Sequence, residues 1–438
     1  MAVLLPSFLF LLTIKIYKMS AIKALGIQKA KALGLRSMGS TENINETYTI
    51  NDIVQDAYWV DIKTRKKTNL MDLRDNKIWF IIKFKKNAIG KTFKAQIGCL
   101  SNPKGVTNIG VSIIEKEEIF LSYDLQGEDF KDLLGNIQKF YYILRTENDR
   151  TGKIYPLSQN DYLKVHIIRY VPQILQNQRP AWEVSARTQY LWFDGNPNEK
   201  PWRKDPVLDF VSMEWILGFE RMREFYNNEI MQKWNNDNAI KLLKQRIKEQ
   251  TTDSEVNLKL PVNVGDSVKF GVFDKKLKDY PNIEQPKLNG KKDNEIIPIF
   301  EKFYCQNLQY KISKVPPEKS DDLLGAFASC QFRIIASGEI KKVDISKYEI
   351  NIIQIGVYMK DSFDFITNDE YLGDWSLIAN DIMKNPYFTT FKNYYAVKNV
   401  DYRNYRKDYN KGGDYNIYSS IKTENVNFKI EVNDTEIS

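Results

Sequence analysis

Apolar and polar residues alternate in several separated segments of this chain. The apolar residues stand at every second position, as in Ile78, Phe80, Ile82 and Phe84; in Phe93, Ala95 and Ile97; in Cys330, Phe332, Ile334 and Ala336; and in Val426, Phe428, Ile430 and Val432. Because successive side chains of a strand point to opposite faces, this period of two predicts β-strands with one buried face. Residues 348–359 are largely apolar on both faces, which predicts a strand buried on both sides. The patterning therefore favours an α+β chain that is mainly β.

The first β-rich region is predicted to span residues 39–172. Its segments 77–85 and 92–97 flank Asn87–Lys91, and this arrangement predicts a hairpin. Further strands are expected at 107–114, 118–124, 138–146 and 161–171. Many short strands separated by turn signals are typical of an immunoglobulin-like β-sandwich, which we expect here.

The pattern changes after residue 172. Tryptophan and proline residues are frequent from 173 onwards, which predicts a connector, and a helix is expected from about Phe210. Apolar residues then follow a helical stripe: Trp215, Phe219, Met222, Tyr226, Ile230 and Trp234. A second helix is predicted over 238–250. Residues 173–260 thus form a connector with helices, and residues 261–438 form a second β-rich domain.

The N-terminal segment 1–38 is apolar and then basic. The apolar run from Ala2 to Ile14 is shorter than the roughly 20 residues that a membrane-spanning helix needs. Residues 19–36 could form a basic amphipathic helix, which would bring residues 1–36 to a membrane surface or to secretion machinery. Alternatively Met19 starts the protein, or the segment docks on the protein or frays. We favour the second group of interpretations.

The composition excludes several classes of site. The single histidine, His166, cannot build a His₃ zinc site or a two-histidine iron site, and its β-branched neighbours favour a structural role in a strand. Three cysteines are too few for a Cys₄ site or a disulfide framework, and they suggest a reducing compartment. No phosphate-binding loop or nucleophile elbow is present. We therefore predict no cofactor and no metal.

Asp361 and Asp364 are the candidate catalytic residues. Two carboxylates three residues apart, directly after a predicted buried strand, could act as general acid and base if burial raised one pKa. A strand that ends in a turn is also rich in Asp, so the spacing alone leaves both interpretations open. The acidic residues Asp369, Glu370 and Asp374 follow but lack the spacing of a calcium loop. For the pair Asp321-Asp322 we favour a structural role at a helix or strand start.

The segment 391–411 is basic and rich in tyrosine, and it leads into Gly412-Gly413-Asp414. The predicted binding residues here and in the preceding loop are Lys360, Tyr402, Arg403, Tyr405, Arg406, Gly412, Gly413 and Asp414. Such a segment could be a solvated loop, a protein interface, or a surface for single-stranded nucleic acid or glycan. The net charge of +8 is otherwise mixed along the chain, so nucleic acid is the least favoured partner.

Several blocks in a fixed order resemble a bacterial family known as domain of unknown function 6402. They are Ala181–Arg187, Trp192–Gly195, Met213–Arg221, Asp321–Phe327, Ile355–Phe365, Leu372–Trp375, Val397–Arg403 and Lys411–Tyr415. Phe363 stands where the family pattern has a tyrosine. The resemblance covers about residues 173–432 and implies a cargo, or a companion of cargo, of type VI-like contractile injection systems. It also implies a bacterial cytoplasmic location before export.

Two hypotheses for function follow. The leading one is a non-enzymatic interaction protein that binds a secretion-system or effector component. The alternative is an antibacterial effector that hydrolyses an envelope glycan with Asp361 and Asp364 as acid and base.

Overall fold

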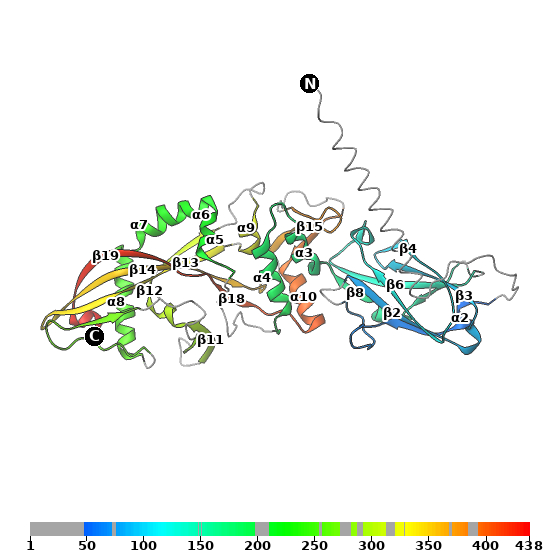
Figure 1. Ribbon diagram of the computed structural model, residues 1–438, viewed down its shortest axis with the longest axis horizontal. Coiled ribbons are helices and arrows are strands. Elements are labelled where there is room, and N and C mark those ends of the chain that lie inside the picture. The colour runs from blue at the N-terminus through cyan, green and yellow to red at the C-terminus, as the bar shows by residue number, and fades with distance from the viewer. Residues whose placement is uncertain are drawn as a thin grey trace, which may run out of the picture. The chain divides into compact units, whose positions relative to one another are not determined.

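The structure is a computed structural model that describes residues 48–71, 76–147, 149, 151–197, 210–253, 256–271, 282–286, 292–311, 320–327, 329–367, 370–383 and 393–438. These residues form two compact units that divide between His166 and Ile167. The chain is α+β and mainly β, as predicted (Figure 1). The segment 1–36, predicted to reach a membrane surface, lies outside the described residues. In the described part, no helix is both long and apolar enough to cross a membrane.

The first unit contains two antiparallel sheets. One has the order β1-β2-β5, with β1 at Val54–Trp59, β2 at Lys77–Phe84 and β5 at Glu118–Asp124. The other has the order β4-β3-β6-β7 with β8 beside β6, and its strands are β3 (Thr92–Cys99), β4 (Asn102–Ile113), β6 (Ile137–Arg145), β7 (Lys153–Tyr155) and β8 (Leu163–His166). The predicted strands are present, but the one expected at 161–171 is strand only over β8, because a 3-10 helix follows at Ile167–Tyr170; His166 lies in this strand as expected.

The predicted hairpin across Asn87–Lys91 is wrong. Strand β2 pairs with β1 and β5, whereas β3 pairs with β4 and β6, so the two predicted partners belong to different sheets. After β2 the chain makes a 3-10 turn at Lys86–Ala88 and crosses to the other sheet. Phe84 and Phe93 then meet through their rings, with centroids 5.2 Å apart. Alternation looks the same in a hairpin and in a crossing between sheets, so it could not tell them apart.

Aromatic side chains fill the space between the two sheets. Phe80 from one sheet stacks on Tyr142 from the other at a centroid distance of 4.1 Å, and Trp59 meets Tyr142 edge-on at 4.9 Å. All three side chains are buried. The two sheets therefore pack face to face, while an immunoglobulin-like topology stays a prediction.

The Trp- and Pro-rich segment contains two helices that the sequence did not predict, α3 (Val171–Gln176) and α4 (Glu183–Asp194). A residue far away in the sequence caps the first turn of α4. The carboxylate of Asp322 accepts hydrogen bonds from the amides of Val184 at 3.0 Å and Ser185 at 2.8 Å. A carboxylate at this position satisfies amides that have no partner within a helix.

The helix predicted from Phe210 is broken rather than continuous. It is divided into α5 (Met213–Gly218), α6 (Glu220–Phe225), a π-helix η5 (Tyr226–Ile230) and α7 (Met231–Lys233). Phe219 is extended and ends α5. Met222, Tyr226, Ile230 and Trp234 are all buried at intervals of four residues, and the wider π turn keeps such residues on one face. The second predicted helix is confirmed as α8 (Asp237–Thr252), capped by Asn236.

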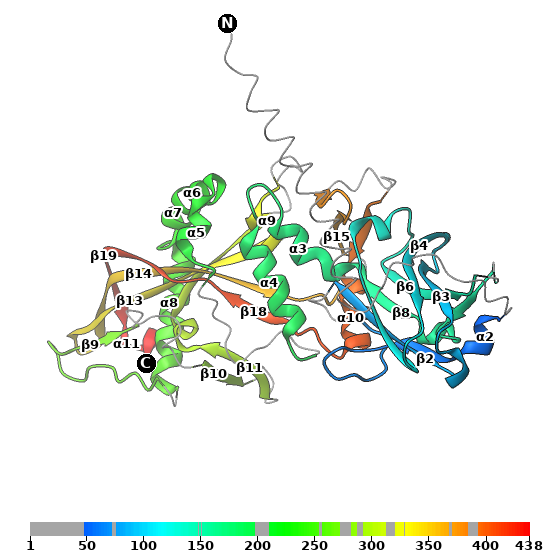
Figure 2. The ribbon, with the colours of Figure 1, turned by 45° about the vertical axis from the view of Figure 1, so that its right-hand side comes forward.

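The main sheet of the second unit has the order β12-β13-β14-β18. Its strands are β12 (Tyr304–Lys311), β13 (Ser329–Asp344), β14 (Lys347–Phe363) and β18 (Tyr415–Tyr418), with β19 (Lys422–Asn433) beside β14 and β9 (Ser267–Phe270) beside β13. Helix α6 packs on one face through Phe225 and Phe332, and α8 lies on the opposite face, where Arg246 meets Tyr304 (Figure 2).

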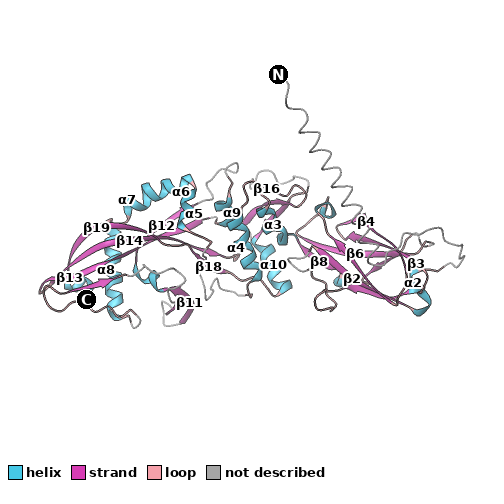
Figure 3. Cartoon of the chain, in the orientation of Figure 1, coloured by secondary structure: helices cyan, strands magenta, loops and turns pink. Residues whose placement is uncertain are grey.

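Smaller elements surround one end of this sheet. They are the three-stranded sheet of β15 (Tyr371–Ser376), β16 (Asp381–Met383) and β17 (Tyr395–Lys398), and the helices α9 (Asp322–Ala326) and α10 (Asn399–Tyr409). A separate pair of strands, β10 (Asn282–Pro286) and β11 (Lys292–Pro298), and the short helices η7 (Ile299–Phe303) and α11 (Asp434–Ile437) complete the second unit (Figure 3).

Candidate functional site

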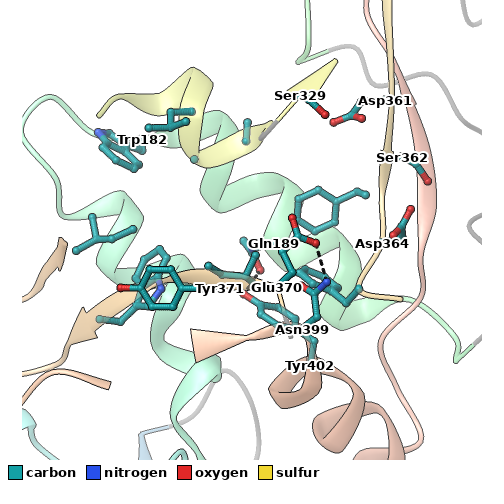
Figure 4. A pocket seen from close by; sticks show the side chains of 18 of the residues that line it. Trp182, Gln189, Ser329, Asp361, Ser362, Asp364, Glu370, Tyr371, Asn399 and Tyr402 are labelled. Atoms are coloured by element: carbon teal, nitrogen blue, oxygen red, sulfur yellow. Dashed lines mark hydrogen bonds between the residues drawn. The ribbon is translucent and has the colours of Figure 1, made fainter. Parts of the chain in front are cut away.

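A cavity of about 230 Å³ lies in the second unit, where the end of β14 meets α4, α9, α10 and β15. Both candidate catalytic residues, Asp361 and Asp364, line it (Figure 4). The other polar lining residues are Gln189, Ser320, Ser329, Ser362, Glu370, Tyr371, Asn399 and Tyr402. The cavity therefore joins residues from distant parts of the chain around the two predicted carboxylates.

The main sheet is split beside this cavity. Pairing of β13 with β14 ends at Gln331 and Lys360, although β13 begins at Ser329 and β14 continues to Phe363. Beyond that point β13 stays paired with β12, and β14 stays paired with β18. Cys330 and Ser329 of β13 therefore lie across a gap from Asp361 and Ser362 of β14, and the side chains of Ser329 and Asp361 point toward one another (Figure 4).

Asp361 is the electrostatically unusual residue of the cavity. Burial raises the pKa of its carboxyl group well above the ordinary value, and the negative charge of Asp364 adds to this effect. A hydrogen bond from the Ser362 backbone works in the opposite direction but does not outweigh them. A carboxyl group whose pKa is raised in this way is suited to donate a proton as a general acid.

Several buried polar atoms of the lining lack a hydrogen-bond partner among the described residues. Two of them are the indole Nε1 of Trp375, a donor, and the amide Oδ1 of Asn399, an acceptor. The Nδ2 of Asn399 donates to Glu370 at 2.9 Å, which fixes the direction in which its oxygen points. Buried polar groups are normally paired, so these two atoms suit a ligand with both hydroxyl donors and acceptors.

Aromatic side chains form part of the wall. Phe365 and Tyr402 stack almost in parallel with centroids 3.7 Å apart, and the Tyr402 hydroxyl donates to Gln189 at 2.9 Å. Trp182 and Trp375 also line the cavity. Apolar ring faces beside a few convergent polar groups are the usual composition of a small-molecule site.

The basic, tyrosine-rich segment is not a loop. Residues from Asn399 to Tyr409 form helix α10, and Tyr402 and Tyr405 are both 1% exposed. Arg403 donates to the backbone oxygens of Phe365 at 2.7 Å and Thr367 at 3.1 Å. These predicted binding residues serve internal packing, because tyrosines three and seven positions apart lie on one face of a helix.

Gly412, Gly413 and Asp414 hold the end of α4. The amides of Gly412 and Gly413 donate to the backbone oxygens of Gly195 at 2.9 Å and Trp192 at 3.0 Å. A Cβ atom on Gly412 would lie 2.5 Å from the Trp192 ring. Glycine is therefore required by close packing and by a φ of +101°, and the pair is not a turn exposed to solvent.

Asp414 is fully buried and pairs with Arg406. Burial raises the pKa of Asp414, against the opposing effects of the Trp192 indole and the Arg406 guanidinium. The predicted binding residues Arg406 and Asp414 therefore form an internal ion pair.

Lys360 also has an internal partner. Its Nζ lies 2.8 Å from a carboxylate oxygen of Glu301, which is 3% exposed and also pairs with Arg333. Burial opposes the charge of Glu301, but Lys360 and Arg333 outweigh it and hold its pKa below the ordinary value. This network attaches η7 to β13 and β14.

The acidic pair at 321–322 has the structural role that we favoured. Asp321 caps α9 by accepting from the Leu324 amide at 3.0 Å, and it forms a two-pronged ion pair with Arg221. Among the other acidic residues considered, Asp374 is buried in β15, and Asp369 lies outside the described residues. No group of three metal-binding side chains occurs among the residues that the structure describes.

Sequence reasoning missed most of the lining. Gln189, Ser329 and Asn399 come from α4, β13 and α10, and none stands in a motif that marks it as functional. Glu370 was considered only as a metal ligand. The cavity depends on contacts between distant segments, which local patterns do not encode.

Residues 168–433 match the family of unknown function DUF6402, which covers more than half of the chain. The chain belongs to this family. Every residue that lines the cavity lies inside the family region. No curated protein and no solved structure matches the chain.

Proposed function

We propose that the cavity around Asp361 binds a glycan and hydrolyses it, with Asp361 as general acid and Asp364 as general base. The observation that carries this proposal is the position of Asp361, whose raised pKa keeps a proton available inside a concave site that also contains a second carboxylate. Aromatic walls and unpaired hydrogen-bonding atoms of both kinds support a hydroxyl-rich ligand.

The proposed reaction needs two proton transfers. The Asp361 carboxyl group donates its proton to the glycosidic oxygen as the carbon–oxygen bond breaks. Asp364 takes a proton from a water molecule whose oxygen bonds to the anomeric carbon. One water is consumed and two hydroxyl ends are formed, as in glycoside hydrolysis by paired carboxylates.

The direct test measures new reducing ends after incubation of the full chain with peptidoglycan sacculi or with chitotetraose. We expect Asp361→Asn and Asp364→Asn each to lower the rate at least about 100-fold, the usual size of an acid–base contribution. Asp344→Asn, an exposed change outside the cavity, is the matched control. Absence of cleavage by the unmodified chain on both materials would contradict the proposal.

The proposal also includes export of this protein by a contractile injection system. The family resemblance implies cargo of a contractile injection system, and such a cargo with glycan hydrolase activity would be an antibacterial effector. Expression directed to the periplasm should then be toxic and cytoplasmic expression should not, and Asp361→Asn should abolish the toxicity.

The interaction hypothesis stays a prediction, but several of the residues that it invoked have partners inside the second unit. Tyr402 and Tyr405 are buried, and Lys360, Arg403 and Arg406 bind partners within the second unit. No other described feature favours it over the hydrolase proposal.

A further inference from the structure

A second cavity of about 160 Å³ adjoins the split in the main sheet. It is lined by Gln309, Ser329, Cys330, Gln331, Lys360, Asp361, Ser362 and Asn416. Three of these residues, Ser329, Asp361 and Ser362, also line the first cavity. The two cavities therefore meet at the gap between β13 and β14, with Asp361 at their junction.

The register shows on which face of the sheet the second cavity lies. Gln309 is opposite Gln331, Gln331 is opposite Lys360, and Ser362 is opposite Asn416. Directly opposed residues share a face, and residues two apart along a strand do so as well. The polar lining thus belongs to the face that carries η7 and α8, whereas Cys330 and Asp361 alternate to the other face.

Asn416 supplies an independent sign of a ligand. Its side chain is 3% exposed, and the Nδ2 has no hydrogen-bond partner among the described residues. A buried amide donor without an acceptor costs free energy, unless a bound molecule supplies the acceptor oxygen. The second cavity is where that oxygen would lie.

The charges around the second cavity favour an uncharged ligand. The ammonium of Lys360 is already paired with the carboxylate of Glu301, so its charge does not require a negatively charged ligand. Apart from the Asp361 carboxyl group and the Cys330 thiol, the remaining polar side chains of the lining are amides and hydroxyls, which act as donors and acceptors together and match sugar hydroxyl and N-acetyl groups.

Size also links the two cavities. Each is smaller than the roughly 300–1,000 Å³ that is typical of ligand sites, but the two together fall within that range. We propose that they are two subsites for one uncharged glycan chain of more than two sugars, which passes through the split sheet so that one end of the chain contacts Asn416 and the other end lies against the aromatic wall. This inference rests on the proposed function, and it places Asp361 between the two subsites.

The test uses calorimetric titration of the full chain carrying Asp361→Asn, which prevents cleavage. We expect chitotetraose to bind at least about ten times more tightly than chitobiose, because only the longer chain fills both subsites. Adding Asn416→Ala should lower the affinity for chitotetraose about tenfold, the equivalent of ~1.4 kcal/mol, and leave chitobiose unaffected. Gln331→Ala, an exposed change in the same cavity, tests the proposal if the Asn416 variant does not fold.

Asn351→Ala is the matched control, because Asn351 lies on β14 outside both cavities and also has an unpaired buried atom among the described residues. Equal affinities for the two sugars, no binding at millimolar concentration, or an unchanged affinity in the cavity variants would overturn the inference. Length-dependent binding without cleavage would leave the subsites standing and refute the hydrolase. If the unmodified chain cleaves chitotetraose but Asn416→Ala and Gln331→Ala have no effect on binding, the hydrolase proposal stands and the two subsites are refuted.

Discussion

The carboxylate of Asp414 accepts a 2.8 Å hydrogen bond from the indole N–H of Trp192, a residue 222 positions earlier in the chain. Arg406 binds the same carboxylate oxygen, and its guanidinium lies 5.3 Å from the Trp192 ring centroid. Trp192 from the Trp- and Pro-rich segment and two of the predicted binding residues thus form one buried contact between α4, α10 and the segment before β18.

Replacing Asp414 by Asn should destabilise the protein by about 3–5 kcal/mol, because Arg406 would keep a buried charge without its partner. The free energy of unfolding, measured by urea denaturation, gives the effect. Glu431→Gln, at an exposed position of β19, is the control and should change stability by less than about 0.5 kcal/mol. Equal effects of the two changes would contradict the structural role of Asp414.

Gly412→Ala should cost about 3 kcal/mol or more, from the strain of a positive φ together with a collision with Trp192. Gly265 has a similar φ of +98° but open space around it, so Gly265→Ala should show the backbone strain alone, about 1–2 kcal/mol. Thermal or urea unfolding of both variants separates the two contributions. A smaller loss for Gly412→Ala than for Gly265→Ala would show that Trp192 moves aside.

Asp361 should make the protein less stable as the pH rises. Because its folded pKa is raised, the folded state binds more protons than the unfolded state above about pH 4, and stability falls toward the folded pKa. Asp361→Asn removes this effect, so the stability of the variant relative to the original should increase as the pH rises from about 4 toward neutral. Melting curves from pH 4 to 8 measure the difference, and a constant difference across that range would contradict the assignment.

Glu301 should have the opposite pH dependence. Its folded pKa is lowered, so the stability from its ion pairs is present above the unfolded pKa and is lost as the pH falls through the folded value. Glu301→Gln should cost about 3–5 kcal/mol at neutral pH, because Arg333 and Lys360 lose a buried partner. The loss should shrink when unfolding is measured below pH 4. Glu349→Gln, which removes a partly exposed pair with Lys429, should cost less than about 1 kcal/mol.

Alternation predicted several of the strands, such as β2, β3, β13 and β19, because each of them shows its buried face in the local sequence, but it missed β12. It could not give the partners of β2 and β3, which depend on how the chain crosses between sheets. The helix α10 was accessible in principle, since Tyr402, Tyr405 and Tyr409 follow helical spacing. The helix was not predicted, because the basic residues beside these tyrosines were interpreted as part of a binding surface.

The carboxylates of the site were identified from sequence, but its surroundings were not. Asp361 stands after a recognisable apolar run, whereas its raised pKa results from burial by distant elements. Asn416 was not noticed at all, because a buried amide without a partner can be recognised only after the fold is known.

The contact between Trp192 and Asp414 has a consequence for the newly made chain. At about 5–20 residues per second, the ribosome needs roughly 10–45 seconds to add the 222 positions that separate the two residues. During this interval α10 and the segment around Asp414 have not been made, so the apolar side of α4 stays uncovered. Nascent chains with exposed apolar surface are prone to aggregate. The first unit is complete when His166 has emerged, so the two units finish folding at different times during translation.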